Sequence, residues 1–339
     1  MAKYKVGIIG GDGIGPEVID ETLKVIKATG IELDTVSYDL GADRYLRTGD
    51  VLPDATLEEI RGLDAVLLGA VGPPVGSTAV PSGILERGLL LKLRFELDLF
   101  INLRPFITPK GWNRFNIEPV DMVVIRENTE GTYAGEGGQL RRGTPYEIAT
   151  QGSVNTRFGV ERTVRFGFEL AASRPRKHLT LVHKTNVLTF SGDLWQRTFN
   201  EVSKEYPSVE IAYNHVDAAC IYMVESPSRY DVIVTDNLFG DILTDLCGAV
   251  SGGIGLAASA NLNPNRTGPS LFEPVHGAAH DIVGTGKANP LAAIRSGALM
   301  LDFLGEKEAA GKINKVLEEF EVPAGATTAS IGNAIAERV

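Results

Sequence analysis

Cysteine is scarce in this sequence: only Cys220 and Cys247 occur among 339 residues. They form no CxxC pair, and two thiols in a chain of this length suit a reducing compartment better than a disulfide scaffold. No uninterrupted apolar run approaches the length of a membrane span. After Met1 the chain has no basic segment followed by an apolar stretch and a cleavage site. We therefore expect a cytoplasmic protein without membrane contact.

Positive charge is also in short supply. Lysine and arginine total 33 against 43 aspartates and glutamates, which gives a net charge of -10. This balance argues against a nucleic-acid footprint, so no nucleic-acid partner is expected. An anionic substrate would have to be bound by a local group of arginines. With 43% hydrophobic residues, the chain can form one large domain or two intermediate ones.

Short β-branched runs alternate with longer amphipathic stretches along the chain. The runs lie at residues 6–9, 65–68, 122–125, 179–182 and 232–235. This alternation predicts an α/β fold with a mainly parallel sheet. Ligands of open α/β sheets gather beyond the carboxyl ends of the strands. The polar residues that follow these runs are therefore the first candidates for a site.

Two segments do not fit this alternation. Residues 131–150 are rich in Gly, Thr and Tyr, and they predict an extended arm or a small hairpin that could contact a second chain. Residues 252–274 are rich in turn formers and predict a return between domains. From residue 290 to residue 320 the pattern is helical again.

A glycine-rich segment, residues 11–17, follows the first predicted strand and precedes a helix. The dinucleotide fingerprint requires G-x-G-x-x-G, whereas Gly11, Gly13 and Gly15 alternate here. Pro16 stands where a third glycine would pack the helix against the strand. The pattern therefore favours a glycine-rich turn at the edge of a cofactor site over a phosphate-binding Rossmann loop.

Three aspartates are candidates for metal ligands. Asp241 and Asp245 lie four residues apart and share one face of a predicted helix whose neighbouring faces are apolar. Carboxylates near a core are costly without a cation, although such a pair can also form a solvated face. Asp217 has no local counter-charge either. Carboxylate ligands without a thiol or histidine cluster favour Mg²⁺ or Mn²⁺.

Three arginines and two further residues complete the candidates. Arg94, Arg104 and Arg126 are each bordered by apolar residues. Singly, each could be a structural ion-pair partner, but together they could anchor a substrate with two carboxylates. Lys184 ends an apolar strand, where an amine could act as a general base. Tyr133 is a candidate proton donor, and its alternative is an ordinary surface position.

Six motifs occur together in one order: GDGIGPE at 11–17, NLRP at 102–105, RENTEG at 126–131, HKTNV at 183–187, DNLFGD at 236–241 and EPVHG at 273–277. In these motifs the chain resembles the metal-dependent β-decarboxylating dehydrogenases of the isocitrate/isopropylmalate dehydrogenase family. The resemblance covers essentially the whole chain. It implies a two-domain α/β fold with an open sheet that is not a Rossmann fold.

The resemblance also implies an organisation. Residues 1–100 and 253–339 would form a terminal domain on the cofactor side. Residues 101–252 would form a central domain with the arm and a dimer interface. The resulting homodimer would share its active sites, because each site would draw Lys184 and Asp217 from the second chain.

The implied reaction is NAD-dependent oxidation of a malate-type dicarboxylate followed by decarboxylation, with Mg²⁺ or Mn²⁺. Arg94, Arg104 and Arg126 would bind the substrate carboxylates. Asp217, Asp241 and Asp245 would bind the metal, and Asp217 would also contact the substrate. Lys184 would accept the hydroxyl proton, and Tyr133 would protonate the enol.

NAD would lie along one C-terminal segment. Asp281 would accept hydrogen bonds from the adenosine ribose, which disfavours NADP. His280 stands directly before it, where the family commonly has proline. The full set implied for the cofactor is His276, Gly277, Ala278, Ala279, His280, Asp281, Ile282, Val283, Gly284 and Asn289.

The residues before Arg94 bear on which side chain the substrate carries. Isocitrate-type relatives place serine and asparagine six and four residues before this arginine, whereas this chain has Gly88 and Leu90. Leu90 and Leu91 could line a pocket for a branched alkyl group or belong to the core of a helix. D-malate and tartrate enzymes can carry leucines there too, so these substrates stay open. A non-catalytic regulatory subunit is disfavoured because every candidate side chain is present.

Overall fold

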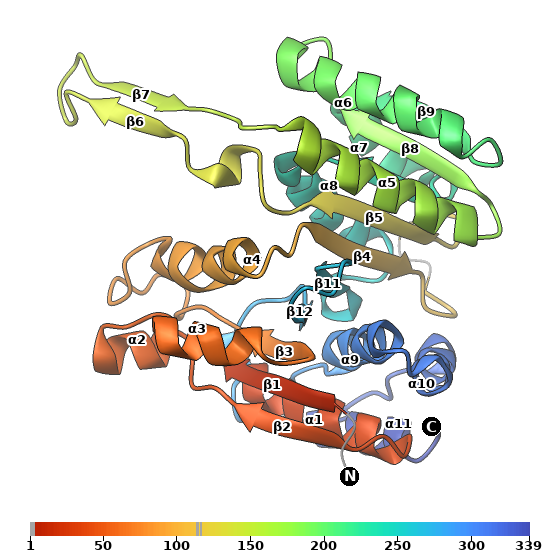
Figure 1. Ribbon diagram of the computed structural model, residues 1–339. Coiled ribbons are helices and arrows are strands. Elements are labelled where there is room, and N and C mark those ends of the chain that lie inside the picture. The colour runs from red at the N-terminus through yellow and green to blue at the C-terminus, as the bar shows by residue number, and fades with distance from the viewer. Residues whose placement is uncertain (1–3, 113–114, 116) are drawn as a thin grey trace.

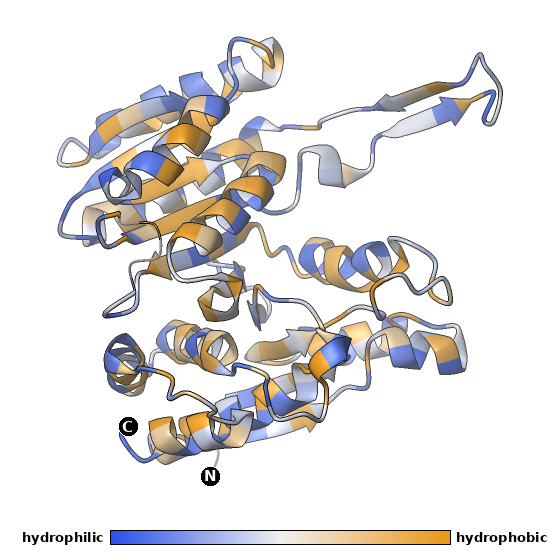
Figure 2. Cartoon of the chain, turned by 180° about the vertical axis from the view of Figure 1, so that it is seen from behind, coloured by the Kyte–Doolittle hydropathy of each residue, from blue (hydrophilic) through white to orange (hydrophobic). Residues whose placement is uncertain are grey.

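The computed structural model describes residues 4–112, 115 and 117–339. Within these residues, one ten-stranded sheet has the strand order β2-β1-β3-β12-β11-β4-β5-β10-β8-β9. Helices cover both faces of the sheet, and both termini lie at the same end of the molecule (Figure 1). Figure 2 shows that hydrophobic residues dominate many of the strands, whereas hydrophilic residues occur on the outer faces of the helices. The core therefore lies between the sheet and its helices.

The elements have the following bounds in the described residues. The strands of the large sheet are β1 (Tyr4–Gly11), β2 (Leu33–Ser37), β3 (Ala65–Ala70), β4 (Ile101–Ile107), β5 (Asp121–Glu127), β8 (His178–His183), β9 (Glu210–His215), β10 (Val232–Thr235), β11 (Ala258–Leu262) and β12 (Ser270–Pro274). The α-helices are α1 (Gly15–Ala28), α2 (Ala42–Thr48), α3 (Asp54–Arg61), α4 (Lys92–Glu96), α5 (Arg157–Ser173), α6 (Thr189–Val202), α7 (Val216–Glu225), α8 (Asn237–Val250), α9 (Leu291–Leu304), α10 (Lys307–Glu319) and α11 (Thr328–Ala336). Short helical turns include η1 (Glu86–Leu91), η2 (Thr132–Ala134), η5 (Ile254–Leu256) and η6 (His280–Ile282).

The five predicted strands are confirmed, because they lie within β1, β3, β5, β8 and β10. Strands β3 and β10 are buried along their whole length, which explains their continuous runs of apolar residues. The outer strand pairs of both halves are parallel, as predicted. Antiparallel pairs join β12 to β11, β11 to β4 and β4 to β5 in the middle of the sheet. The sheet is therefore mixed at its centre.

Residues 252–274 differ from the prediction. Their sequence predicts a return between domains, but they contain β11 and β12, two central strands. Strand β11 is buried throughout. Its sequence, ASANL, nevertheless lacks the β-branched residues that mark strands in a sequence. Its Asn261 is bonded to the amides of Asn102 and Asn128. Tertiary hydrogen bonds rather than local propensity stabilise this strand.

The strands fall into two contiguous halves. Those from residues 1–100 and 253–339 occupy the half from β2 to β11, and those from residues 101–252 occupy the half from β4 to β9. The sheet is continuous across the junction between β11 and β4. The division into two domains at these boundaries therefore stays a prediction.

The segment 131–150 contributes to a hairpin, as expected. Strands β6 (Gly137–Leu140) and β7 (Ile148–Gln151) pair in antiparallel fashion and extend away from the body of the molecule (Figure 1). Every residue of both strands is exposed. The contact of this arm with a second chain stays a prediction. Among the described residues, no helix has both the length and the apolar character that crossing a membrane requires.

Candidate active site

Arg126 occupies the carboxyl end of β5 and is almost fully buried, with 1% of its side chain exposed. Its Nε donates a hydrogen bond to Oδ1 of Asn237 at 3.0 Å, and its guanidinium binds the carboxylate of Asp241. A Cβ at position 240 would lie 2.5 Å from Cγ of Arg126. The start of α8 can therefore approach this arginine because Gly240 has no side chain.

Arg104 and Arg94 lie beside Arg126. Arg104, on the neighbouring strand β4, donates a hydrogen bond to Thr244 at 2.5 Å and lies 4.0 Å from Asp241. Arg94 follows the π-helical turn η1 and lies 3.7 Å from Glu273 on β12. We call Arg94, Arg104 and Arg126 the arginine cluster.

The arginine cluster is electrostatically crowded. Burial, and then the charge of Arg126, lowers the pKa of Arg94. The same two causes, followed by the charge of Arg94, lower the pKa of Arg104 to about 10. The guanidinium group of arginine is not deprotonated in proteins, so both side chains are cationic. Asp241 and Glu273 are the carboxylates that pair with the cluster in the described residues. Three cations against two anions leave positive charge for an anionic ligand.

Tyr133 and Asp241 are in direct contact. The phenol of Tyr133 donates a hydrogen bond to Oδ2 of Asp241 at 2.7 Å, and its ring lies 5.1 Å from the guanidinium carbon of Arg126. Burial raises the pKa of Tyr133, so the phenol keeps its proton near neutral pH. Burial also pushes the pKa of Asp241 upward, but Arg126, the Tyr133 hydrogen bond and the other two arginines lower it overall. The site thus pairs a protonated phenol with an ionised carboxylate.

A pocket of about 180 Å³ opens beside the arginine cluster. Its lining includes Leu90, Arg94, Arg104, Glu273 and His276. Leu91 is half-buried and does not line this pocket, whereas Leu89 is fully buried in the core. One cavity therefore combines two cationic side chains, an apolar side chain and the start of the predicted cofactor segment.

The predicted cofactor residues form an irregular segment at this pocket, which we call the 276–284 loop. Nε2 of His276 is buried and has no hydrogen-bond partner among the described residues, and burial lowers the pKa of this imidazole. A Cβ at Gly277 would meet open space, and Asp281 is exposed. An uncharged ring nitrogen without a partner beside an open cavity fits a nucleotide.

The other residues of the predicted cofactor set differ in burial, backbone conformation and hydrogen bonding. Ala278 is buried and Val283 is exposed, while Ala279 adopts the left-handed conformation with φ 40° before η6. Asn289 accepts a hydrogen bond from Leu291 N–H at 3.0 Å at the start of α9. Asn289 also lines a second cavity of about 380 Å³. The remaining members lie in or next to η6, namely His280, Ile282 and Gly284.

Lys184 and Asp217 form a separate pair. Nζ of Lys184 donates a hydrogen bond to Oδ2 of Asp217 at 2.7 Å, and this bond lowers the pKa of the carboxyl. Asp217 lies on α7 with 67% of its side chain exposed. In the described part of the chain, no hydrogen bond or ion pair joins either residue to the arginine cluster. The described residues of one chain therefore show no direct contact between this pair and the arginine cluster.

The predicted metal ligands also fall into two groups: Asp217 belongs to the pair with Lys184, whereas Asp241 and Asp245 lie on α8. Asp241 and Asp245 lie one turn apart on α8, and Asp245 is exposed without an ion pair to any described residue. The described residues of one chain contain no group of three His, Cys, Asp or Glu side chains that could hold a metal ion. The two α8 carboxylates fit a hard divalent cation, provided that further oxygen ligands come from another chain, the substrate or water.

Two residues of this site were not assigned from the sequence. Glu273 binds Arg94 and accepts a hydrogen bond from Asn261 at 2.7 Å, and Asn237 bridges Arg126 and the backbone carbonyl of Glu130. Both lie inside the six sequence motifs. The available signal was the apolar strand around Glu273, because a carboxylate buried there requires a donor or a cation.

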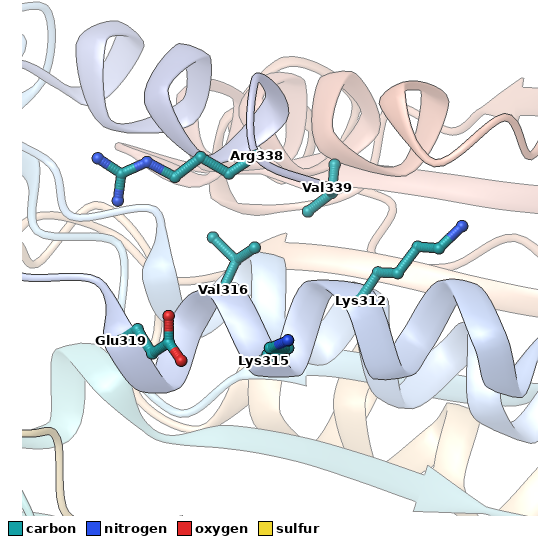
Figure 3. Close-up of a pocket in the computed structure, with 6 residues that line it drawn as sticks. All are labelled: Lys312, Lys315, Val316, Glu319, Arg338 and Val339. Carbon is teal, nitrogen blue, oxygen red and sulfur yellow. The ribbon is translucent and has the colours of Figure 1, made fainter.

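A third cavity of about 370 Å³ lies elsewhere, between α10 and the C-terminus. Figure 3 shows Lys312 and Lys315 on α10 and Arg338 and Val339 on the opposite side. None of its lining residues belongs to the predicted site, and both lysines are exposed. This cavity is therefore separate from the arginine cluster and from the 276–284 loop.

Comparison with known proteins supports the arrangement. The sequence profile of the family described as isocitrate/isopropylmalate dehydrogenase matches residues 5–337. A 3-isopropylmalate dehydrogenase from Thermobifida fusca is 57% identical, with 99% of this chain and 97% of the relative covered. Another from Corynebacterium efficiens is 56% identical, with 99% of each chain covered. The crystal structure of isocitrate dehydrogenase from Methylococcus capsulatus is 39% identical, with a TM-score of 0.89 and 99% of each chain covered. The chain therefore belongs to the isocitrate/isopropylmalate dehydrogenase family and, like its members, is an oxidoreductase.

Proposed function

We propose that this enzyme oxidises and decarboxylates 3-isopropylmalate to 4-methyl-2-oxopentanoate, a step of leucine biosynthesis, with NAD and with Mg²⁺ or Mn²⁺. The observation that carries the proposal is the pocket in which Leu90 lies with Arg94 and Arg104. The arginines suit the two carboxylates of a malate, and the leucine suits a branched alkyl group. Two relatives over 55% identical carry the name 3-isopropylmalate dehydrogenase.

The position of Leu90 also bears on the alternatives. A third carboxylate, as in isocitrate, would need a polar partner near this position, but Leu90 and Gly88 offer no side-chain donor. D-malate and tartrate lack the apolar substituent, so they would leave the leucine side of the pocket unfilled. A loss of catalysis, as in a regulatory subunit, is at odds with the contact between Tyr133 and Asp241.

The residues of the chain would divide the work as follows. The arginine cluster binds and orients the two carboxylates, and Asp241 and Asp245 hold the cation. Lys184 accepts the proton of the substrate hydroxyl, and the Tyr133 phenol donates a proton to the enol carbon after CO₂ has left. When bound, the divalent cation supplies positive charge that acidifies the hydroxyl and stabilises the enolate. NAD, held by the 276–284 loop, would supply the acceptor for the hydride of C2.

The proposal includes a homodimer in the cytoplasm with shared active sites. Lys184 and Asp217 pair with one another instead of contacting the arginine cluster of their own chain, which supports a role in the site of a second chain. Exposed Leu140 and Ile148 on the arm offer apolar surface for such an assembly.

The test is NADH production by the purified protein with Mg²⁺ or Mn²⁺ and four substrates in parallel: 3-isopropylmalate, D-malate, tartrate and isocitrate. The highest kcat/KM is expected with 3-isopropylmalate and NAD. A higher value with D-malate, tartrate or isocitrate would replace the proposed substrate, and equal use of NADP would remove NAD specificity. No turnover with any of the four would favour a non-catalytic subunit.

A further inference from the structure

The 276–284 loop has little support from its own residues. Gly277, Ala279, Asp281 and Val283 are exposed, and its regular structure is the single short turn η6. Loops of this kind open locally at low cost unless other elements hold them. A loop that must become ordered when a ligand binds also lowers the affinity for that ligand.

The glycine-rich segment 11–17 holds this loop from one side. Ile14 N–H donates a hydrogen bond to the carbonyl of Ala278 at 2.9 Å. Gly13 permits this approach, because a Cβ there would lie 1.9 Å from the same carbonyl oxygen. Glu17, in the first turn of α1, accepts a hydrogen bond from Gly284 N–H at 2.7 Å. The segment thus contacts the loop near both of its ends.

His280 holds the loop from the other side. Its Nε2 lies 2.7 Å from the carbonyl oxygen of Gly72, and since a carbonyl can only accept, Nε2 carries the proton of this bond. Gly72 N–H donates in turn to the buried carboxylate of Asp12 at 2.9 Å. Ala70 and Val71, directly before Gly72, line the pocket with Arg94. His280 therefore links the 276–284 loop to the other wall of the same cavity.

We propose that Glu17 and His280 are positioning residues for the dinucleotide: they hold the 276–284 loop in its binding conformation before the cofactor arrives. This inference rests on the proposed use of NAD. Neither side chain needs to touch the reacting atoms. If either contact is removed, the loop must become ordered when the cofactor binds, and this ordering costs free energy. Dinucleotide affinity therefore falls, while kcat changes little.

The first test compares Glu17→Ala with Glu17→Gln, which keeps a carbonyl acceptor for Gly284 N–H. Asp20→Ala is the matched control, because Asp20 is an exposed carboxylate on the same helix. NADH binding is measured by fluorescence titration, and hydrogen exchange of the loop amides is measured without cofactor. For Glu17→Ala we expect the Kd and KM of the dinucleotide to rise by about 10-fold, with faster exchange of the loop. Glu17→Gln should recover most of the affinity, and Asp20→Ala should match the wild type.

The second test uses His280→Ala and His280→Gln, of which the latter keeps an N–H donor for Gly72. The alanine variant should raise the Kd for NADH by about 3-fold and speed exchange around Gly72 and the loop, and glutamine should restore part of both. Unchanged exchange and Kd in both alanine variants would overturn the inference while leaving NAD use intact. An equal loss in Glu17→Gln and Glu17→Ala would overturn the role of the acceptor atom. If the wild type bound no dinucleotide, the proposed function would fail together with the inference.

Discussion

The arginine cluster and the Lys184–Asp217 pair differ in how many of their contacts a single chain supplies. Arg126 is buried and held by Asn237 and Asp241, and Arg104 is held by Thr244. Lys184 and Asp217 contact each other, and most of the Asp217 side chain faces solvent. Partners within one chain hold Arg104 and Arg126 of the cluster, whereas Asp217 of the pair is accessible to another molecule. Under the proposed function, one chain would organise substrate anchoring, while removal of the hydroxyl proton by Lys184 would require a second chain.

The largest expected effect comes from the pair. Lys184→Ala should lower kcat by about 10²- to 10⁴-fold, because the proposed acceptor of the hydroxyl proton is lost. Steady-state kinetics with saturating substrate measure this change. A normal kcat with a raised KM would instead make Lys184 a binding residue.

Co-expression of two inactive variants tests whether the two chains of a dimer share their active sites. A Lys184→Ala chain and an Asp241→Asn chain, combined in a dimer with shared sites, form one intact site and one doubly defective site. Random assembly should restore about a quarter of wild-type activity, because about half of the dimers are mixed and each has one intact site of two. Activity no higher than in the separate variants would contradict sharing.

The next effect concerns the metal. Asp245→Asn should weaken Mn²⁺ binding by about 10-fold or more and lower turnover with it, because the proposed hard-cation site loses a carboxylate ligand. Asp245 makes no ion pair in the described structure, so its loss leaves the arginine cluster intact. Calorimetric titration with Mn²⁺ in the presence of substrate measures the affinity. An unchanged titration curve would remove Asp245 from the ligand set.

The comparison extends to stability. Gly240→Ala should lower the free energy of unfolding by about 1–3 kcal/mol, because the added methyl group would press on the buried stem of Arg126. Gly311→Ala is the matched control, since a Cβ on this exposed glycine of α10 meets open space, and it should be neutral or stabilising. Asp217→Ala should change stability much less, because the ion pair of this mostly exposed carboxylate with Lys184 contributes little. Denaturant titrations compare the three variants with the wild type, and equal losses in both glycine variants would argue against the contact with Arg126.

Much of the fold could be predicted from local sequence patterns. The strands with continuous apolar runs, β3 and β10, were found because burial on both faces selects β-branched and leucine side chains. Strand β11 was missed because its stability depends on partners distant in the chain. Asn261 in this strand is bonded to Asn102, Asn128 and Glu273, and no local pattern reports such contacts.

The candidate site was predictable as a set of residues but not as a geometry. The sequence identified Arg94, Arg104, Arg126, Tyr133 and Asp241 as candidates, and the structure brings these together. The sequence offered no indication that Glu273 binds Arg94, because that contact joins α4 to β12. Nor did the glycine-rich segment 11–17 disclose its contacts with the 276–284 loop, since an observed hydrogen bond to Gly284 N–H requires the fold to be known.

A pH-dependent effect on stability tests the strand end that carries Arg126. Glu127 is buried next to it, and burial raises its pKa from the usual 4.5 to about 6, although hydrogen bonds from Thr129 and Glu130 oppose the shift. Because the folded state then binds the proton more tightly than the unfolded state, stability falls as pH rises from about 4.5 to about 6, by about 2 kcal/mol. Glu127→Gln removes this titration while keeping the size of the side chain. The difference in unfolding free energy between the two proteins, measured by denaturation at several pH values, should therefore move in favour of the variant across this window and stay constant above it. Parallel stability curves for the two proteins would show that Glu127 has an ordinary pKa, and that its environment is less apolar than its burial indicates.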